Sequence, residues 1–347
     1  CWGFPMRFKP LWNRLPIFWR LLGFAILWLL LLSTLHWRLN TERHQRKVIR
    51  MGYMPVVTNL AAPLLDFATR ENEGIQFKAI KFASFAEMAE ALRNDAIQAA
   101  FMIAPLAVVL HQQGVDVRVV YIGNRHESTL VARKDLTVNN FRDLAGRTVA
   151  VPMRYSGHNL SLLRLMAAEG LEDEVRIVEM NPPDMAAALS SGALDAYYVG
   201  EPFAAQTLKN GEAQLVHYVE SVWPGFICNL MLVKGSLTEQ QPDDVQQLVS
   251  GAVRAGIWAK THPQEVAQLA AKYWNQDPEL IRYAMNTPEG RIVFDQFLPK
   301  QSEMQDLAAL MHRFGLTSST KVDGLVADRF ARQVPLEGVA DLDTLLP

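Results

Sequence analysis

The sequence predicts an α/β protein with two lobes, joined by a double crossover of the chain and preceded by an N-terminal transmembrane helix. Three observations predict this fold class. From residue 48 onward, short apolar runs alternate with helical patterns, an order typical of parallel sheets covered by helices. The same alternation starts again near Phe141. Residues 21–37 form an uncharged apolar run, and the 347 residues are enough for two lobes with cores of their own.

The uncharged run is either a secretory signal sequence or a single membrane span. Four basic residues precede it: Arg7, Lys9, Arg14 and Arg20. The exit at residues 33–37 (STLHW) lacks the small side chains at alternate positions that signal peptidase requires. We therefore expect residues 1–47 to be an uncleaved membrane anchor rather than a cleaved signal segment.

The first lobe is predicted to comprise residues 48–133 and 228–317. Strands are expected at residues 48–53, 77–82, 99–103 and 117–122, with amphipathic helices between them. Ser84 and Glu87 form the capping-box pattern at the start of one of these helices. This order predicts a parallel sheet with helices on both faces.

The second lobe is predicted to comprise residues 134–227. Strands are expected at residues 148–151, 175–178, 196–199 and 214–218, with helices at 160–169 and from Asn181 to Gly192. A strand at 227–233 then returns to the first lobe and is followed by helices. We expect the lobes to move about hinges at residues 132–134 and 226–233. The pattern does not place the C-terminal tail, residues 318–347.

Composition and motifs argue against several classes of protein. The net charge of −2, with no basic stripe beyond the first 50 residues, argues against nucleic acid as a partner. Two cysteines, Cys1 and Cys228, cannot build a disulfide framework or a zinc cluster, and Cys228 is expected to be a small buried apolar residue. The Gly-x-Ser-x-Gly, phosphate-loop and His-Glu-x-x-His patterns are missing from the sequence. We therefore expect a protein that is not an enzyme and that uses neither a cofactor nor a metal.

Ligands of open parallel sheets bind beyond the carboxyl ends of the strands. The residues at those positions are the candidate ligand-binding residues: Tyr53, Thr58, Asn59, Met102, Ser156, Gly157, His158, Asn159, Glu201 and Asn229. Several of them have plainer alternatives. Thr58 and Asn59 are expected to be helix caps first and ligand contacts second, and a tyrosine such as Tyr53 beside a sheet is most often a core residue.

The loop at residues 156–159 is the most informative of these strand ends. It lies where a helix begins, and the free N–H groups there favour an anion. His158 would add either a hydrogen-bond donor or a full positive charge, and its truncation should weaken binding with little change in stability. The alternative is plain capping by Ser156 or Asn159 with His158 on the surface. Glu201 would orient a donor, pair with His158 across the cleft, or simply be an acid at a helix start.

Four segments resemble the periplasmic substrate-binding proteins of ABC importers. They are residues 141–151 (FRDLAGRTVAV), 184–196 (DMAAALSSGALDA), 156–159 (SGHN) and 200–203 (GEPF). The group that they resemble most binds nitrate, sulfonate, taurine or bicarbonate, and the resemblance extends over residues 48–315. It implies a type II-like two-lobe clamp, a small anionic ligand, and a place for His158 in the ligand pocket. It also implies permease and ATPase subunits as partners, and a position on the periplasmic or other extracytoplasmic face of the inner membrane, held there by the N-terminal helix.

Two alternatives to an importer receptor stay open. One is a membrane-tethered ligand sensor, which would need a second chain for signalling because the sequence shows no kinase, cyclase or DNA-binding segment. The other is a protein of the same fold that binds or makes a precursor of the thiamine pyrimidine, although the cysteine-rich motif of that enzyme is missing here. Importer genes beside this gene would favour the receptor over the sensor, and turnover of a bound compound would favour the enzyme.

Overall fold

The computed structural model describes residues 16–41 and 46–346, in two units that are Cys1–Lys47 and Val48–Pro347. The first unit contains one helix, α1 (Ile17–Thr41). Within it, Ile17–Arg38 is long and apolar enough to cross a membrane, with a mean hydropathy of 1.9, and its side chains are unburied. The apolar N-terminal helix predicted from the sequence is therefore present, and a signal sequence would share these properties.

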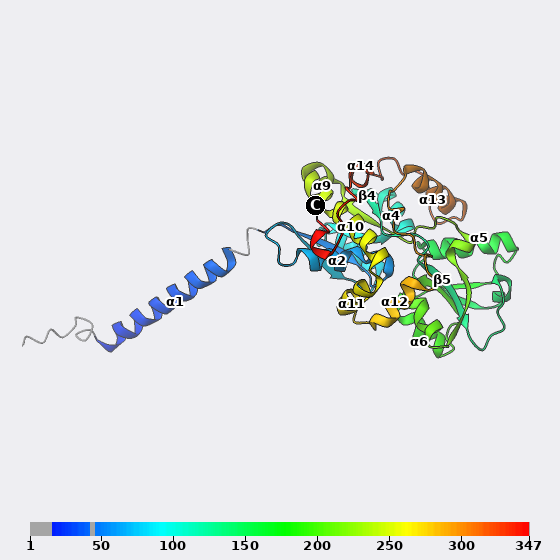
Figure 1. The fold of residues 1–347 in the computed structure, drawn as a ribbon, viewed down its shortest axis with the longest axis horizontal. Helices are drawn as coiled ribbons and strands as arrows, with labels where there is room; N and C mark the ends of the chain where they lie inside the picture. The colour runs from blue at the N-terminus through cyan, green and yellow to red at the C-terminus, as the bar shows by residue number, and fades with distance from the viewer. Residues whose placement is uncertain (1–15, 42–45, 347) are drawn as a thin grey trace, which may run out of the picture. The chain divides into compact units, whose positions relative to one another are not determined.

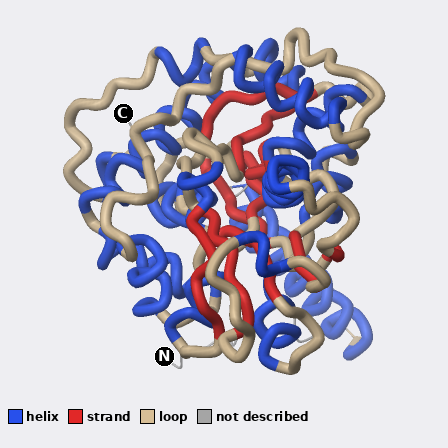
Figure 2. The backbone as a smooth tube through the Cα atoms, turned by 90° about the vertical axis from the view of Figure 1, so that its right-hand side faces the viewer, coloured by secondary structure: helices blue, strands red, loops and turns tan. Residues whose placement is uncertain are grey.

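The second unit holds two five-stranded sheets with helices around them (Figures 1 and 2). The first sheet has the order β2 (Gln76–Lys81), β1 (Val48–Tyr53), β3 (Ala99–Ile103), β10 (Asn229–Lys234) and β4 (Val117–Ile122). The second has the order β7 (Arg176–Glu179), β6 (Thr148–Val151), β8 (Ala196–Gly200), β5 (Ser128–Arg133) and β9 (Ala213–Tyr218). The expected strands are present to within two residues.

The prediction of wholly parallel sheets was wrong. In the first sheet β10 runs antiparallel to β3 and β4, and in the second sheet β5 runs antiparallel to β8 and β9. These are the two strands that directly follow the chain crossings between the lobes. A strand that enters a sheet from the other lobe, without a crossover helix, arrives in the opposite direction to its neighbours.

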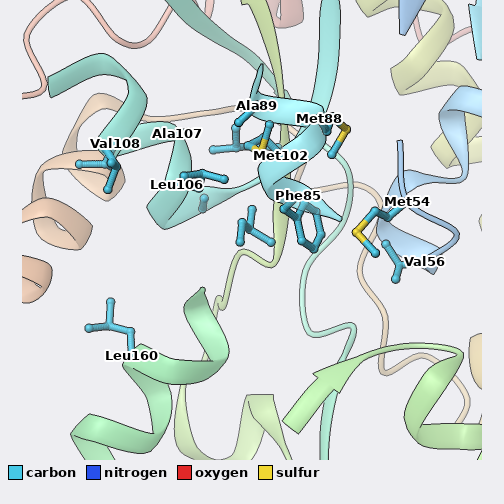
Figure 3. Close-up of a cluster of buried hydrophobic side chains, with 14 of the residues drawn as sticks. Met54, Val56, Phe85, Met88, Ala89, Met102, Leu106, Ala107, Val108 and Leu160 are labelled. Carbon is cyan, nitrogen blue, oxygen red and sulfur yellow. The ribbon is translucent and has the colours of Figure 1, made fainter. Parts of the chain in front are cut away.

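Helices cover both faces of the first sheet. The larger ones are α2 (Ala61–Thr69), α3 (Phe85–Arg93), α4 (Ala104–Gln112), α10 (Pro242–Thr261), α11 (Pro263–Trp274), α12 (Pro278–Asn286) and α13 (Gln301–Arg313), with short α9 (Gly235–Gln240), α14 (Arg329–Arg332) and the 3-10 turns η2 (Val57–Asn59) and η4 (Leu342–Thr344). One apolar core lies under α2, α10 and α11. Another lies under α3, α4 and α13 and also includes Leu160 of the second lobe (Figure 3). This second core therefore joins the two lobes.

The second lobe has smaller helices around its sheet. They are η3 (Phe141–Leu144), α5 (Gly157–Glu169), α6 (Pro182–Ser190), α7 (Phe203–Lys209) and α8 (Val219–Val222). The helix α5 begins three residues before the predicted start at 160 and ends at Gly170, which is left-handed with φ of 67°. At Ser84, which caps α3, the side chain accepts from the Ala86 backbone N–H.

The structure corrects the predicted boundary between the lobes. The stretch Ser128–Arg133 was assigned to the first lobe, but it is β5 of the second sheet. The first crossing is therefore the segment 123–127, and residues 132–134, the predicted hinge, lie at the far end of β5. The second crossing is the segment 223–228, so that the predicted hinge at 226–233 overlaps it only at its start and otherwise lies in β10.

The two crossings lie side by side. Arg125 forms antiparallel bridges with Ile227 of the second crossing and with Val293, from the chain between α12 and α13. The buried guanidinium of Arg125 donates to the carbonyl of Gly225 at 2.8 Å and pairs with Glu303 of α13, also at 2.8 Å. Three chain segments and α13 are thus tied together at the junction of the lobes.

The C-terminal tail packs on the first lobe. Val326 bridges to Val119 of β4. Further along, the buried Arg254 of α10 donates hydrogen bonds to the backbone carbonyls of five tail residues: Pro335, Glu337, Gly338, Thr344 and Leu345. The tail, which the sequence pattern did not place, is therefore an ordered part of this lobe.

Candidate ligand-binding site

Buried polar side chains gather where the lobes join. Thr58 lies in η2, Asn229 at the start of β10, Asn124 and Glu127 in the first crossing, and His158 in the first turn of α5. Each has one buried side-chain atom without a hydrogen-bond partner among the residues that the structure describes: Thr58 Oγ1, Asn124 Oδ1, Glu127 Oε2, His158 Nδ1 and Asn229 Oδ1. Buried polar atoms are nearly always bonded, so a group of this kind points to a small polar solute or ordered water. We call these five residues the junction site.

Hydrogen bonds tie the loop after β1 to the first crossing and to the second lobe. Glu127 Oε1 accepts from the backbone N–H of Thr58 at 3.3 Å, and Asn124 donates to the carbonyl of Val57 at 3.2 Å. The backbone N–H of Val57 donates to the carbonyl of Glu201 in the second lobe at 2.8 Å. The loop after β1 is therefore held against both the first crossing and the second lobe.

Glu127 is the member that the sequence did not single out. Burial raises the pKa of its carboxyl well above the ordinary value, and the nearby carboxylate of Glu201 raises it further, against smaller opposing contributions that include the Thr58 N–H and Arg291. The carboxyl therefore favours its protonated form, in which it can donate a hydrogen bond. Gly200 makes room for it, because a Cβ at that position would lie 2.6 Å from Glu127 Oε2.

His158 is neither on the surface nor charged. Its Nε2 lies 2.9 Å from Ser128 Oγ and 3.9 Å from Cys228 Sγ, and its ring packs edge-on against Tyr198. Burial lowers the pKa of His158 to about 3, so the imidazole is neutral and can offer its free Nδ1 as a single donor or acceptor. Of the two roles expected for His158, burial agrees with the hydrogen-bond donor and argues against the full positive charge, and the alternative of a surface position was wrong. Cys228 is buried and burial raises its thiol pKa, as expected of an apolar residue.

The other residues of the loop before α5 have structural roles. Ser156 caps α5, with its Oγ accepting from the Asn159 backbone N–H at 3.1 Å, and Asn159 Nδ2 donates to the carbonyl of Arg154 at 2.8 Å. A Cβ at Gly157 would lie 2.7 Å from the ring of Phe226, so only glycine fits there without a shift. The capping alternative therefore holds for Ser156.

Asn59 and Asn229 lock the loop after β1 to the start of β10. Asn59 donates to the carbonyl of Met54 at 3.0 Å, and Asn229 donates to Asn59 Oδ1 at 2.8 Å. Tyr53 and Met102 are fully buried members of the two first-lobe cores. Tyr53 is therefore a core residue, as the alternative to ligand binding stated. It belongs to the core under α2, α10 and α11 and not to the core that joins the lobes.

Glu201 pairs with an arginine and not with His158. Its carboxylate lies 3.2 Å from Nη2 of Arg291 and accepts from Thr129 Oγ1 at 2.6 Å and from the Ala205 N–H of α7 at 2.9 Å. The predicted pairing with His158 was wrong, and the alternative of an acid at a helix start is confirmed. Burial raises the pKa of Glu201, and Arg291 is the largest influence that lowers it.

Arg291 was missed by reasoning from the sequence. It is 90 residues from Glu201 along the chain and follows no strand, so no local pattern indicated it. Its guanidinium also donates to the carbonyls of His126 and Ser128, lies 3.6 Å from Glu220, and stacks over Tyr218 at 4.4 Å. Two carboxylates neutralise this cation, so it offers little free charge to a ligand.

A surface cavity of about 410 Å³ lies between the two lobes, and no residue of either crossing lines it. It is lined by Ser84 and Phe85 at the start of α3, and by Met153, Asn181 and Asp184 of the second lobe. Two of its lining residues also belong to the apolar core that joins the lobes: Phe85 is a member of that core, and Met153 packs against it.

Comparison with known proteins shows which family the chain belongs to. Residues 42–275 match the model of the NMT1-like family. The chain belongs to this family. An aliphatic sulfonates-binding protein of Bacillus subtilis is 24% identical over 279 residues, covering 76% of this chain and 82% of that protein. The taurine-binding periplasmic protein of Escherichia coli is 28% identical over 202 residues, covering 55% of this chain and 62% of that protein.

Solved structures of other proteins have the same fold as this chain. The ligand-binding component of an ABC-type import system from Staphylococcus aureus superposes with a TM-score of 0.75 at 20% identity, covering 84% of this chain and 99% of that one. The NMT1-like chain described here thus has the two-lobe fold of periplasmic binding proteins, as the four sequence segments implied.

Proposed function

We propose that this NMT1-like protein is the solute-binding receptor of an ABC-type importer, and that it encloses a small anion at the junction site. The observation that supports this most is the group of five buried polar atoms without a protein partner, which both lobes and the first crossing supply. The family, and relatives named for binding sulfonates and taurine, agree with it. The receptor would deliver its ligand to permease and ATPase subunits.

The polar groups of the junction site indicate that an anion would be held by neutral hydrogen-bond donors. The hydroxyl of Thr58, a ring N–H of His158 and the protonated carboxyl of Glu127 are all neutral donors. Two buried cations lie close by, and both are paired: Arg291 with Glu201 and Glu220, and Arg125 with Glu303. The ligand would therefore be recognised by hydrogen bonds to its oxygen atoms, as suits nitrate, bicarbonate or a sulfonate group, and not by a direct ion pair.

The same contacts explain how a ligand would close the clamp. Thr58 and Asn229 belong to the first lobe, whereas His158 belongs to the second. A solute that bonds to both sides stabilises the closed arrangement over an open one by the energy of the bonds that only the closed form makes. The crossings at residues 123–127 and 223–228 would absorb the motion.

We propose further that α1 stays uncleaved and anchors the receptor on the extracytoplasmic face of the inner membrane. Its apolar length and basic flanks support this. Importers work beside the membrane, so a tethered receptor would stay close to its permease at a high effective concentration.

Calorimetric titration of the detergent-solubilised full chain tests the function. Nitrate, bicarbonate, taurine and methanesulfonate are the ligands, and ethylammonium is the control for charge. Binding of at least one anion, abolished or weakened in a Thr58→Val variant, is the expected result. If no anion binds and mass spectrometry finds a copurifying compound that the protein converts, the enzyme alternative replaces this proposal.

A further inference from the structure

A cavity of about 500 Å³ is lined by residues of α5 and α13 and by the second crossing. Figure 1 labels both helices, one in each lobe. The residues that matter for its chemistry are Arg164, Trp223, Phe226, Asp306, Leu310 and Arg313. A neighbouring hollow of about 290 Å³ shares Arg164, Leu310 and Arg313 with it. The two together form one groove, which we call the α5–α13 groove, with one wall from each lobe.

Arg164 lines this groove, and no carboxylate of the described residues pairs with it. Its guanidinium lies 4.4 Å from the ring centre of Trp223, and it has no ion pair among the residues that the structure describes. Partial burial lowers the pKa of Arg164, which means that the charge is already partly removed from water. A guanidinium that rests over an aromatic ring loses freedom of movement, and its planar set of N–H groups stays available to an acceptor.

Arg313 faces the groove from the other wall. It lies over the ring of Phe314 at 5.6 Å and, in the part of the chain that the structure describes, it too has no carboxylate partner. Of the two acids that line the groove, Glu303 is paired with Arg125 at 2.8 Å, which leaves Asp306. Two arginines against one acid give the groove a net positive charge of one.

Phe226 separates the groove from the junction site. Its ring contacts Gly157 on the groove side, and it lies 5.9 Å from the ring of His158 on the other. A ligand in the groove would therefore touch none of the five junction residues.

We propose that the α5–α13 groove binds a planar organic monoanion, with its carboxylate or sulfonate on Arg164 and Arg313 and its flat body along Trp223. Guanidinium forks match the geometry of these oxygen groups and bind them through two parallel hydrogen bonds. A volume of about 500 Å³ suits a ligand of one or two rings. Asp306 opposes a second negative charge, so a dianion fits less well. The proposal does not depend on the function of the junction site.

The test is calorimetric titration of the full chain in detergent with 2-naphthalenesulfonate, after subtraction of a detergent blank. Arg164→Gln and Arg313→Gln should each weaken binding at least ten-fold. Arg282→Gln, an exposed arginine of α12 outside the groove, should leave it unchanged. The neutral 2-naphthalenesulfonamide should bind at least ten-fold more weakly than the sulfonate.

Each other outcome overturns the proposal. The groove is not an anion site if both groove variants bind the sulfonate as tightly as the wild-type chain does. The same conclusion follows if the sulfonamide binds as tightly as the sulfonate, or if the wild-type chain binds neither. Loss of binding in Thr58→Val alone would place the sulfonate at the junction site instead. Circular dichroism confirms the fold of each variant, and Arg313, exposed on α13, decides the matter if Arg164→Gln does not fold.

Discussion

Glu201 and Arg291 form an ion pair at 3.2 Å in which the side chains are only 3% and 2% exposed. The pair joins the end of β8 in the second lobe to the segment after α12, which returns along the first crossing. Breaking such a pair leaves a buried charge without its partner, which is far more costly than loss of a surface pair.

We predict that Glu201→Gln lowers the free energy of unfolding by about 3 kcal/mol. The double variant Glu201→Gln with Arg291→Met should lose less than the sum of the two single variants, because the interaction between the two residues is then lost only once. Urea denaturation followed by circular dichroism measures both. Glu90→Gln, in the exposed pair with Arg93, is the control and should change little. Strict additivity of the two single changes would contradict a direct interaction.

His158 offers a pair of substitutions that separates binding from stability. Asparagine can place a polar atom near the position of Nδ1, the free atom, while glutamine can reach the position of Nε2, which meets Ser128. We predict that His158→Gln loses about ten- to hundred-fold in ligand affinity, the equivalent of about 1.5–3 kcal/mol for one hydrogen bond to a charged group. His158→Asn should keep more affinity but less stability. Calorimetry measures the affinity and thermal melting the stability. If His158→Gln binds the ligand more tightly than His158→Asn does, Nδ1 does not contact the ligand.

The sequence also predicted that truncation of His158 to alanine would leave stability nearly unchanged, and burial now argues otherwise. The ring packs on Tyr198 and Phe226 at centre distances of 5.3 and 5.9 Å. Removing it would leave a cavity and an unpaired Ser128 hydroxyl, so alanine would lower both stability and binding.

The raised pKa of Glu127 predicts how stability and binding depend on pH. In the unfolded chain this carboxyl ionises at an ordinary value, so as pH rises the unfolded state loses the proton first. The free energy of unfolding should therefore fall as the pH rises above the ordinary carboxyl value of 4.5. Anion affinity should fall in the same direction, because ionised Glu127 cannot donate.

Glu127→Gln tests this directly, since glutamine keeps a donor at every pH. Urea denaturation and calorimetry at several pH values should show a shallower fall in both stability and affinity than in the wild-type chain. A part of the fall in stability should persist, because burial also raises the pKa values of the carboxyl groups of Glu201 and Glu220. Identical pH profiles for variant and wild type would mean that Glu127 is ionised throughout.

Arg254 should decide whether the C-terminal tail stays in place. It donates to five tail carbonyls, and its side chain is buried. We predict that Arg254→Gln lowers the free energy of unfolding by about 2–3 kcal/mol, in line with loss of hydrogen bonds to a charged group. Limited proteolysis should then cut the chain between residues 333 and 341. Arg332→Gln, an exposed residue of the same tail, is the control and should leave the cleavage pattern unchanged.

The unit of residues 48–347 should fold without the N-terminal helix. All the strands and both lobes lie in this unit. Removal of residues 1–46 is therefore predicted to give a soluble protein with the circular dichroism of an α/β fold and the ligand affinity of the full chain. An unfolded product would show that the first unit contributes to the fold.

The sequence by itself determined most elements of this fold, although β5 at Ser128–Arg133 was not predicted as a strand. The apolar alternation at residues 48–53 or 148–151, and the helical spacing between strands, depend only on neighbours along the chain, and the structure contains these elements close to their predicted bounds. Capping of α5 by Ser156 is equally local. The order of four short segments was enough to indicate the family.

Only the tertiary structure decided which way β5 and β10 run, where the lobes divide, and what surrounds each polar side chain. Glu201 meets Arg291, Thr58 meets Glu127, and Arg254 meets the tail, all through contacts between residues far apart in the chain. Whether His158 is charged likewise depends on the rings and crossings that enclose it. Local pattern specifies a side chain's element and face, but its partners and its pKa depend on long-range packing, which no short stretch of sequence contains.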